Sequence, residues 1–301
     1  MHTTYSVYDP MGNITVLVTS PVPASMRATV AKHLMETVPG AEQVGFLFFD
    51  TVKSPIIPEG NTVIPAKHTV IPAKAGILPI GRLEMAGGEF CGNAAMSAAA
   101  LIAESQGLLA GEEVTIPLEV SGADGIVNVQ VVRETNNAGF QCTVEMPLPA
   151  TVEIFSTVVD ETPVSLPLVR LPGIAHFVIQ LADDQTFDEA FGETVQRQLR
   201  ELSTKVEAAA YGLIFIGAED APILPLLYVP AADTMVWENA CGSGSAAVAA
   251  YLSAQQGTSV SLPLLQPGGA TILARAKTVL VKPGEASRVT ELSITGQVRK
   301  R

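Results

Sequence analysis

Two stretches of the chain are apolar at nearly every position and rich in alanine. They lie in residues 87–107 (GGEFCGNAAMSAAALIAESQG) and 237–257 (WENACGSGSAAVAAYLSAQQG). Each ends in Gln-Gly at the same interval from its cysteine, and a glycine at that place is typical of a helix stop. Because the apolar positions surround each predicted helix instead of forming one stripe, both helices are expected to be buried on all sides.

Short apolar runs of β character flank both predicted helices in the same order. Residues 44–49 and 211–217 precede the helices, and residues 114–122 and 260–269 follow them. Because strand, cysteine, helix and strand recur in one order, the pattern indicates an internal repeat. Chance similarity between two alanine-rich helices is the alternative.

Three further segments add to this pattern. Residues 142–150 (CTVEMPLPA) have β character, and two prolines end the strand. Residues 187–208 have the period of an ordinary amphipathic surface helix. The tandem duplication TVIPAKHTVIPAK at residues 62–74 predicts an extra hairpin or loop.

These elements predict an α+β fold with two pseudo-symmetric halves. Each half is expected to be a curved, mostly antiparallel sheet wrapped around its central apolar helix, because few long crossover helices separate the strands. The N-terminal domain, which carries Cys91, is placed at residues 1–148 and is completed by the last strand at about 291–301. The C-terminal domain, which carries Cys241, is placed at residues 149–290.

Composition and charge indicate which binding partners and which cellular compartment to expect for the protein. The 301 residues are 48% hydrophobic and 16% charged, which is typical of a folded protein of two domains. The net charge of -12 disfavours nucleic acid and anionic membranes as partners. The polar N-terminus does not resemble a signal peptide, and no apolar run is long enough for a membrane span. Three cysteines do not make a disulfide framework, so free thiols in a reducing cytoplasm are expected.

Cys91 and Cys241 stand at the N-terminal ends of the two predicted helices. A helix N-terminus carries unpaired N–H groups and a partial positive charge, so a thiolate there is expected to have a lowered pKa. The same N–H groups can hold a carboxylate. If the halves face each other about a pseudo-two-fold axis, the two thiols meet from opposite sides. Inversion at a carbon needs that arrangement: one thiolate removes the α-hydrogen, and the other thiol protonates the opposite face.

Other interpretations of the cysteines are weaker. Cys142, in the strand-like FQCTVEM, is expected to be a small buried hydrophobe. The chain has no CxxC motif and no histidine cluster, so a metal is not expected. CGSGS lacks the lysine of a phosphate loop and the GxGxxG spacing of a dinucleotide site. No lysine suggests a Schiff base, so no cofactor is expected.

The motif CGNAAM at residues 91–96, together with ACGSGSA at 240–246 and the repeat, resembles the diaminopimelate epimerase-like superfamily. That superfamily also holds proline racemases, hydroxyproline epimerases and the phenazine-biosynthesis isomerases, and the resemblance covers essentially the whole chain. GGEFCGNAAMS, WENACGSGSA and LLQPGGATILA are most similar to the cofactor-independent histidine racemases of staphylopine-type metallophore biosynthesis.

The resemblance implies roles for individual residues. Asn13, in YDPMGNITVLV, matches an asparagine of the family's opening strand that contacts substrate. His176, in AHFVIQL, matches the histidine of an Asn-Pro-His triplet, although a packed core histidine is the alternative. The residues assigned to the site are the catalytic Cys91 and Cys241 and the substrate-binding Asn13, Gly92, Asn93, His176, Glu238, Gly242, Ser243 and Gly244.

The assigned residues are given different tasks. The residues just after each cysteine are expected to offer backbone N–H groups to the α-carboxylate. Glu238 is expected to bind the α-amino group or to support Cys241, with a solvated carboxylate as the alternative. Glu42 is a weaker candidate for binding an imidazole, and for Gln43 beside it a plain surface position is one interpretation.

The expected activity is a two-thiol racemisation of an amino acid, without pyridoxal phosphate and with histidine as the favoured substrate. Diaminopimelate epimerases carry CGNG-x-R after the first cysteine and Glu-Arg-Gly before the second, and this chain has neither arginine. A substrate with a zwitterionic far end is therefore disfavoured.

Three rival functions remain at this point. The first is racemisation or epimerisation of another amino acid, of the diaminopimelate or proline type. The second is a phenazine-type isomerase that uses a carboxylate. The third is a non-catalytic binding protein. Retention of both cysteines argues against the last two. The family often forms dimers, so a homodimer is one expectation.

Overall fold

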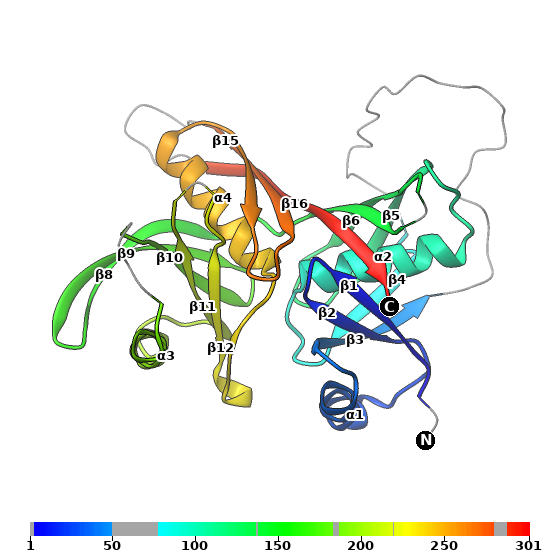
Figure 1. Cartoon of the computed structure of the whole chain (residues 1–301), viewed down its shortest axis with the longest axis horizontal. Helices are drawn as coiled ribbons and strands as arrows, with labels where there is room; N and C mark the ends of the chain where they lie inside the picture. The colour runs from blue at the N-terminus through cyan, green and yellow to red at the C-terminus, as the bar shows by residue number, and fades with distance from the viewer. Residues whose placement is uncertain (1–2, 50–77, 137, 183–186, 219, 280–287) are drawn as a thin grey trace.

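The structure, a computed structural model, describes residues 3–49, 78–136, 138–182, 187–218, 220–279 and 288–301. The duplicated segment at residues 62–74 lies outside the described residues. The chain forms an α+β fold of two halves that lie side by side, with one long strand running between them (Figure 1).

The first half is a ring of eight strands around the helix α2 (Gly92–Ser105). The ring closes because its first and last strands pair with each other. The helix contacts every strand of the ring, so its residues from Gly92 to Ala103 are all buried, as the apolar pattern predicts. The strands are β1 (Tyr5–Pro10), β2 (Ile14–Val18), β3 (Ala41–Phe49), β4 (Gly81–Met85), β5 (Glu113–Val120), β6 (Ile126–Arg133), β7 (Phe140–Glu145) and β16 (Arg288–Lys300).

The opening strand expected at residues 8–18 is in fact a hairpin of β1 and β2. Met11 and Gly12 have positive φ angles of 60° and 100° and turn the chain between the two strands. The helix α1 (Ala24–Thr37) covers the outer side of β3 and is absent from the pattern read from sequence. It buries only Ala31 and Leu34, so its apolar stripe is too short to stand out.

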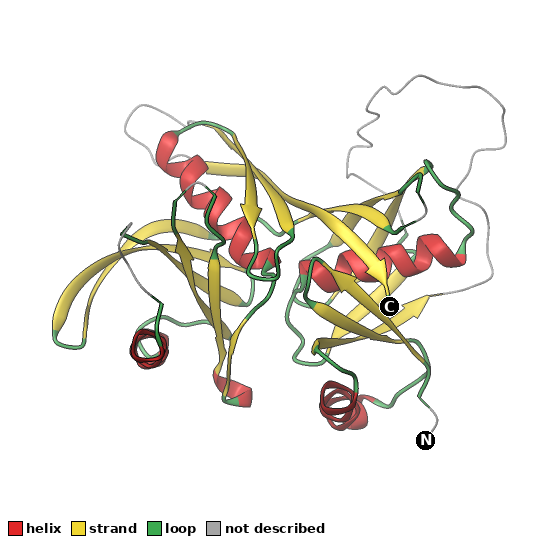
Figure 2. Cartoon of the chain, viewed as in Figure 1, coloured by secondary structure: helices red, strands yellow, loops and turns green. Residues whose placement is uncertain are grey.

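The second half places the helix α4 (Gly242–Gln256) between a six-stranded sheet and the strands at the end of the chain (Figure 2). The helix α3 (Glu189–Ser203) packs on β8, β11 and β12 through a single buried stripe, as expected for the amphipathic segment. The strands are β8 (Thr151–Val159), β9 (Thr162–Leu171), β10 (Ile174–Gln180), β11 (Ala210–Ile216), β12 (Leu224–Val229), β13 (Thr234–Trp237), β14 (Val260–Leu265) and β15 (Thr271–Val279), with a short 3-10 turn η1 (Pro230–Ala232).

The strand β16 belongs to both halves. Its first residues, 288–295, pair with β15, and its later residues pair with β7 and then with β1. Most pairings in both sheets are antiparallel; those of β2 with β3, β4 with β5 and β10 with β11 are parallel. Because β16 passes both central helices, it fixes where the N-terminal ends of α2 and α4 stand relative to each other.

Candidate active site

The two repeated cysteines occupy the same structural position, the N-cap of a central helix. Cys91 caps α2 and Cys241 caps α4, each with an extended backbone. The sulfur of Cys91 accepts a hydrogen bond from the N–H of Ala94 at 3.4 Å, and that of Cys241 accepts one from the N–H of Gly244 at 3.2 Å. Each thiol is therefore held against the positive end of its helix.

The two helix ends meet at β16. Ile294 of β16 lies so close to both Gly92 and Gly242 that an added Cβ would stand 3.0 Å and 2.8 Å from its Cδ1. The side chain of Asn93 crosses between the halves and donates a hydrogen bond to the carbonyl of Ala240 at 3.1 Å. A side chain at either helix start would have to displace the end of Ile294, so glycine fits both positions without a shift.

Cys91 has a neutral hydrogen-bond partner. Its thiol donates to Oε1 of Gln43 at 2.7 Å. The amide of Gln43 in turn donates to Oδ1 of Asn13 and, at 2.7 Å, to the hydroxyl of Thr15. Gln43 is therefore part of the site, and its interpretation as a surface residue is wrong.

Cys241 has an ionisable partner. Its thiol is hydrogen bonded to the carboxyl group of Glu238 and lies 3.6 Å from the hydroxyl of Ser243. Its backbone N–H donates to Oε1 of Gln266 at 2.9 Å, and Gln266 is only 1% exposed. The amide of Gln266 also donates to the hydroxyl of Ser245 at 3.2 Å, so this buried side chain anchors the first turn of α4.

Burial dominates the ionisation of the site. It raises the pKa of the Cys91 thiol to about 12, against the opposing hydrogen bond from Ala94, and the nearby charges of Glu89 and Glu238 raise it further. Burial also raises the pKa of Cys241 well above its ordinary value, and the charge of Glu238 adds to the effect. The expectation of lowered thiol pKa values is therefore wrong: the helix ends do favour the thiolates, but desolvation outweighs them.

The carboxyl group of Glu238 titrates near neutrality. Burial raises its pKa from 4.5 to about 7, although the hydrogen bond from Cys241 opposes the shift. Because the charge of Glu238 raises the pKa of both thiols, it lies near both. It is the group in this site whose charge changes most readily around neutral pH.

Glu42 connects the two halves. One of its oxygens accepts a hydrogen bond from the amide of Asn13 at 2.9 Å, and the other accepts one from the amide of Asn239 at 2.7 Å. Asn239 stands just before Cys241 in the chain. The carboxylate therefore bridges a residue of the first half to the segment that carries the second thiol.

His176 lies on β10 and is fully buried. Burial lowers its pKa to about 3, so its ring is neutral. Neither ring nitrogen has a hydrogen-bond partner among the described residues. Gly212 of the neighbouring strand makes room for the ring, because a Cβ there would lie 2.3 Å from Nδ1. A role for His176 in the substrate pocket remains a prediction.

Cys142 is buried in β7, where its sulfur contacts the carbonyl of Met96 at 3.7 Å and burial raises its pKa.

In the described part of the chain, no group of three or more His, Cys, Asp or Glu side chains is arranged to hold a metal ion. The helices that the structure describes include none long and apolar enough to cross a membrane.

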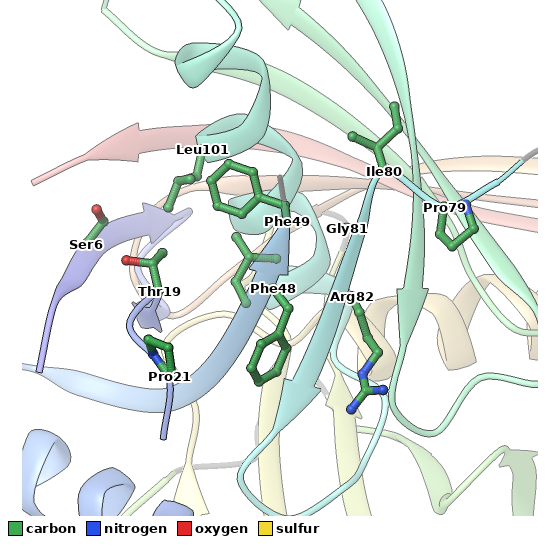
Figure 3. Close-up of a pocket in the computed structure, with 11 residues that line it drawn as sticks. Ser6, Thr19, Pro21, Phe48, Phe49, Pro79, Ile80, Gly81, Arg82 and Leu101 are labelled. Atoms are coloured by element: carbon green, nitrogen blue, oxygen red, sulfur yellow. The ribbon is translucent and has the colours of Figure 1, made fainter. Parts of the chain in front are cut away.

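Two cavities lie outside the pair of thiols. One of about 670 Å³ is in the first half, where Phe48, Phe49 and Arg82 line it, and none of the predicted site residues reaches it (Figure 3). The other, of about 650 Å³, is in the second half, and its lining includes Glu238 and Asn239. The second cavity therefore shares a wall with the site.

Comparison with known proteins gives a family match and several relatives. Residues 78–300 match the family model described as "Histidine racemase CntK N-terminal domain". A histidine racemase of Staphylococcus aureus (strain Mu50) is 27% identical over 274 residues, which is 89% of this chain and 87% of that protein. A histidine racemase of Fusobacterium nucleatum (strain ATCC 23726) is 29% identical over 170 residues, which is 56% of this chain and 62% of that protein. The match thus spans less than two thirds of the Fusobacterium protein.

Solved structures share the fold at low sequence identity. A hydroxyproline epimerase from Agrobacterium vitis, with bound trans-4-hydroxy-L-proline, superposes with a TM-score of 0.66 at 14% identity, covering 99% of this chain and 90% of that one. A phenazine biosynthesis protein of the PhzF family from Bacillus anthracis gives a TM-score of 0.60 at 13% identity, covering 100% of this chain and 97% of that one. These identities establish the fold and nothing finer.

Proposed function

Because the chain belongs to the histidine racemase CntK family, we propose that it interconverts L- and D-histidine by proton transfer between two thiols. The observation that carries the mechanism is the pair of cysteines that cap two buried helices whose ends meet at β16. The family is one of amino-acid racemases, which are isomerases.

In the proposed reaction one thiolate takes the α-proton of histidine, so that the C–H bond breaks and its electron pair stays on an enolate-like carbon. The other thiol then gives its proton to the opposite face of that carbon, and the configuration inverts. The N–H groups of Gly92, Asn93, Gly242 and Ser243 are first-turn amides that can hold the α-carboxylate as negative charge grows on it. The N–H of Gly244 is already bonded to the sulfur of Cys241, so it is better placed to stabilise that thiolate.

The partners of the two thiols support different starting roles. Cys91 donates to the neutral Gln43 and is proposed to begin protonated, as the acid. Cys241 is bonded to Glu238, and we propose that the Glu238 carboxylate takes the thiol proton and leaves Cys241 as the base. Because the pKa of Glu238 is about 7, its carboxylate is available as a proton acceptor at neutral pH, although the raised pKa of the Cys241 thiol makes the transfer uphill.

The remaining expectations complete the proposal. Asn13 and His176 are proposed to line the substrate pocket. The side chain of Asn13 is fixed in place because it accepts a hydrogen bond from Gln43 and donates one to Glu42. The two halves, residues 1–148 with the last strand and residues 149–290, are proposed to be pseudo-symmetric domains with the site between them. The mechanism needs free thiols, which supports the reducing cytoplasm as its setting. A homodimer stays a prediction.

The test is exchange and inversion in deuterated water. We expect the protein to convert either enantiomer of histidine to the other with deuterium at the α-carbon, seen by chiral chromatography and by loss of the α-proton signal. Cys91→Ser and Cys241→Ser should each lower racemisation by about 10²–10⁴-fold, whereas Cys142→Ser serves as the control. Inversion of another amino acid with none of histidine would overturn the substrate, and near-normal inversion by either serine variant would overturn the mechanism.

A further inference from the structure

The cavity in the second half lies between α3 and the residues that lead into Cys241. Its volume of about 650 Å³ falls in the range of roughly 300–1,000 Å³ that is usual for small-molecule sites. One wall consists of Trp237, Glu238 and Asn239. The facing wall includes Phe187 and the first turns of α3, from Glu189 to Gln196.

Exposed aromatic rings gather at this cavity, although the chain as a whole has few of them. Aromatic residues make up only 5% of the sequence. Phe187 is 43% exposed and Trp237 is 37% exposed, and both line the cavity. The ring of Phe191, which also lines it, stands edge-on to Phe187 with centroids 4.7 Å apart. Rings left open at a cavity wall offer flat apolar faces to a planar ligand.

The charge of the cavity wall is of one sign. Asp188, Glu189, Glu193 and Glu238 line it, and among the described residues its lining includes no Lys, Arg or His. The arginines of α3 point to other partners, since Arg197 pairs with Asp160 and Arg200 with Asp233. Carboxylates and exposed aromatic faces both attract cations, so the wall favours a planar cation over a neutral ring or an anion.

We propose that this cavity is an antechamber that binds the imidazolium ring of cationic histidine before the amino acid reaches the thiols. The inference rests on the proposed function and refines its substrate to the cationic form at the point of capture. Glu238 and Asn239 connect the antechamber to the site, because one is bonded to Cys241 and the other to the bridging Glu42. A captured ring would therefore lie against the same two residues that form the edge of the catalytic site.

The chain supplies its own reporter, because Trp237 is its single tryptophan. The probes are 1,3-dimethylimidazolium, which is a permanent cation, and pyrazole, a neutral ring of similar size. We expect the cation to change the tryptophan fluorescence saturably, to bind more weakly as salt is added, and to bind more tightly than pyrazole. In the variant Glu189→Gln/Glu193→Gln we expect the apparent Kd of the cation to rise about fivefold, with a rise in the KM for histidine.

The matched control is Glu36→Gln/Glu207→Gln, which removes the same charge from exposed positions outside the cavity lining. Equal weakening in both double variants would show a general charge effect and overturn the proposal, as would equal affinity for pyrazole and the cation. The titration requires no turnover. A protein that captures the cation without racemising histidine would overturn the proposed function alone, and one that racemises without capture would overturn the antechamber alone.

Discussion

The two catalytic candidates are equivalent in backbone position and unequal in chemistry. Cys91 and Cys241 each cap a buried helix, yet one faces the amide of Gln43 and the other the carboxyl group of Glu238. Burial alone leaves both thiols protonated at neutral pH, because it raises the pKa of each. The carboxylate of Glu238 therefore distinguishes Cys241, the proposed base, from Cys91, the proposed acid.

Replacing Glu238 tests that separation through pH. Below a pH of about 7 the carboxyl group is neutral and cannot take the thiol proton, so the rate of the natural protein should fall as the pH drops through this value. Glu238→Gln should lower kcat roughly 10–100-fold at neutral pH and remove that limb of the pH–rate profile. Glu89→Gln, just before the N-terminus of α2, is the control. An unchanged limb in Glu238→Gln would assign the titration to another group.

The same substitution should act oppositely on stability. The folded-state pKa of Glu238 lies above its ordinary 4.5, so its ionisation opposes folding increasingly as the pH rises from 4.5 through about 7. Above that pH, Glu238→Gln should stabilise the fold by up to about 3 kcal/mol, measured by urea unfolding on both sides of neutrality. A loss of rate with a gain of stability would mark Glu238 as a functional residue instead of a structural one.

Residues whose type is informative can be predicted from the sequence, and those that act through their neighbours cannot. The cysteines stand out because glycines and alanines follow them in both halves. Gln43 and Gln266 carry no such signal, since an amide inside an apolar run is equally compatible with a surface position. The direction of the thiol pKa shifts cannot be predicted from the sequence, because the helix end is visible there and the surrounding desolvation is not.

At the scale of elements, the buried side chain of Gln266 anchors the start of α4. Gln266, in the turn after β14, accepts from the N–H of Cys241 and donates to Ser245 and to the carbonyl of Leu264 at 3.0 Å. The first turn of α4 is thereby tied to the neighbouring hairpin.

Removing that anchor should move the helix end. Gln266→Ala leaves the buried N–H of Cys241 without its partner and removes one of the two hydrogen bonds of the Ser245 hydroxyl, so we expect a loss of roughly 1–3 kcal/mol in unfolding free energy and a lower kcat. Urea unfolding and initial racemisation rates measure the two effects. Gln255→Ala, an exposed glutamine on the same helix, should cost less than about 0.5 kcal/mol. Equal costs at the two positions would contradict an anchoring role for Gln266.

The elements themselves were largely accessible from periodicity. Both central helices, the surface helix α3 and the strands around residues 44–49 and 211–217 lie where the pattern places them. The helix α1 was missed because it buries too few residues to impose a period. The sequence predicts one strand where the structure has the hairpin of β1 and β2. The turn residues Met11 and Gly12 lie inside the motif that resembles the family's opening strand, so they do not stand out as a break.

At the scale of the molecule, the proposed reaction depends on how the two halves are held together. The family match confirms the resemblance to histidine racemases, and the solved structures confirm the α+β fold. Glu42 is the ionisable link across the boundary, with one oxygen on Asn13 and the other on Asn239. Its position makes the alignment of the two thiols sensitive to a residue that touches neither.

Breaking this link should uncouple exchange from inversion. Glu42→Ala removes both hydrogen bonds, so the thiol from one side can still exchange the α-proton while delivery from the other side is misaligned. We expect racemisation to fall about 10–100-fold and deuterium uptake into the unconverted enantiomer to fall less. Mass spectrometry after chiral separation measures both, with the exposed Glu36→Ala as control. A parallel fall of both rates would contradict the alignment role.

The strand shared by both halves has a consequence for how the chain is made. β16 is synthesised after every element of the second half, yet it closes the ring around α2 in the first. Until β16 is made, the ring around α2 lacks the strand that joins β7 to β1, and the second half lacks the strand that pairs with β15 and packs on α4. Neither half can therefore complete its sheet before the last residues of the chain are synthesised, so the two halves are expected to finish folding together.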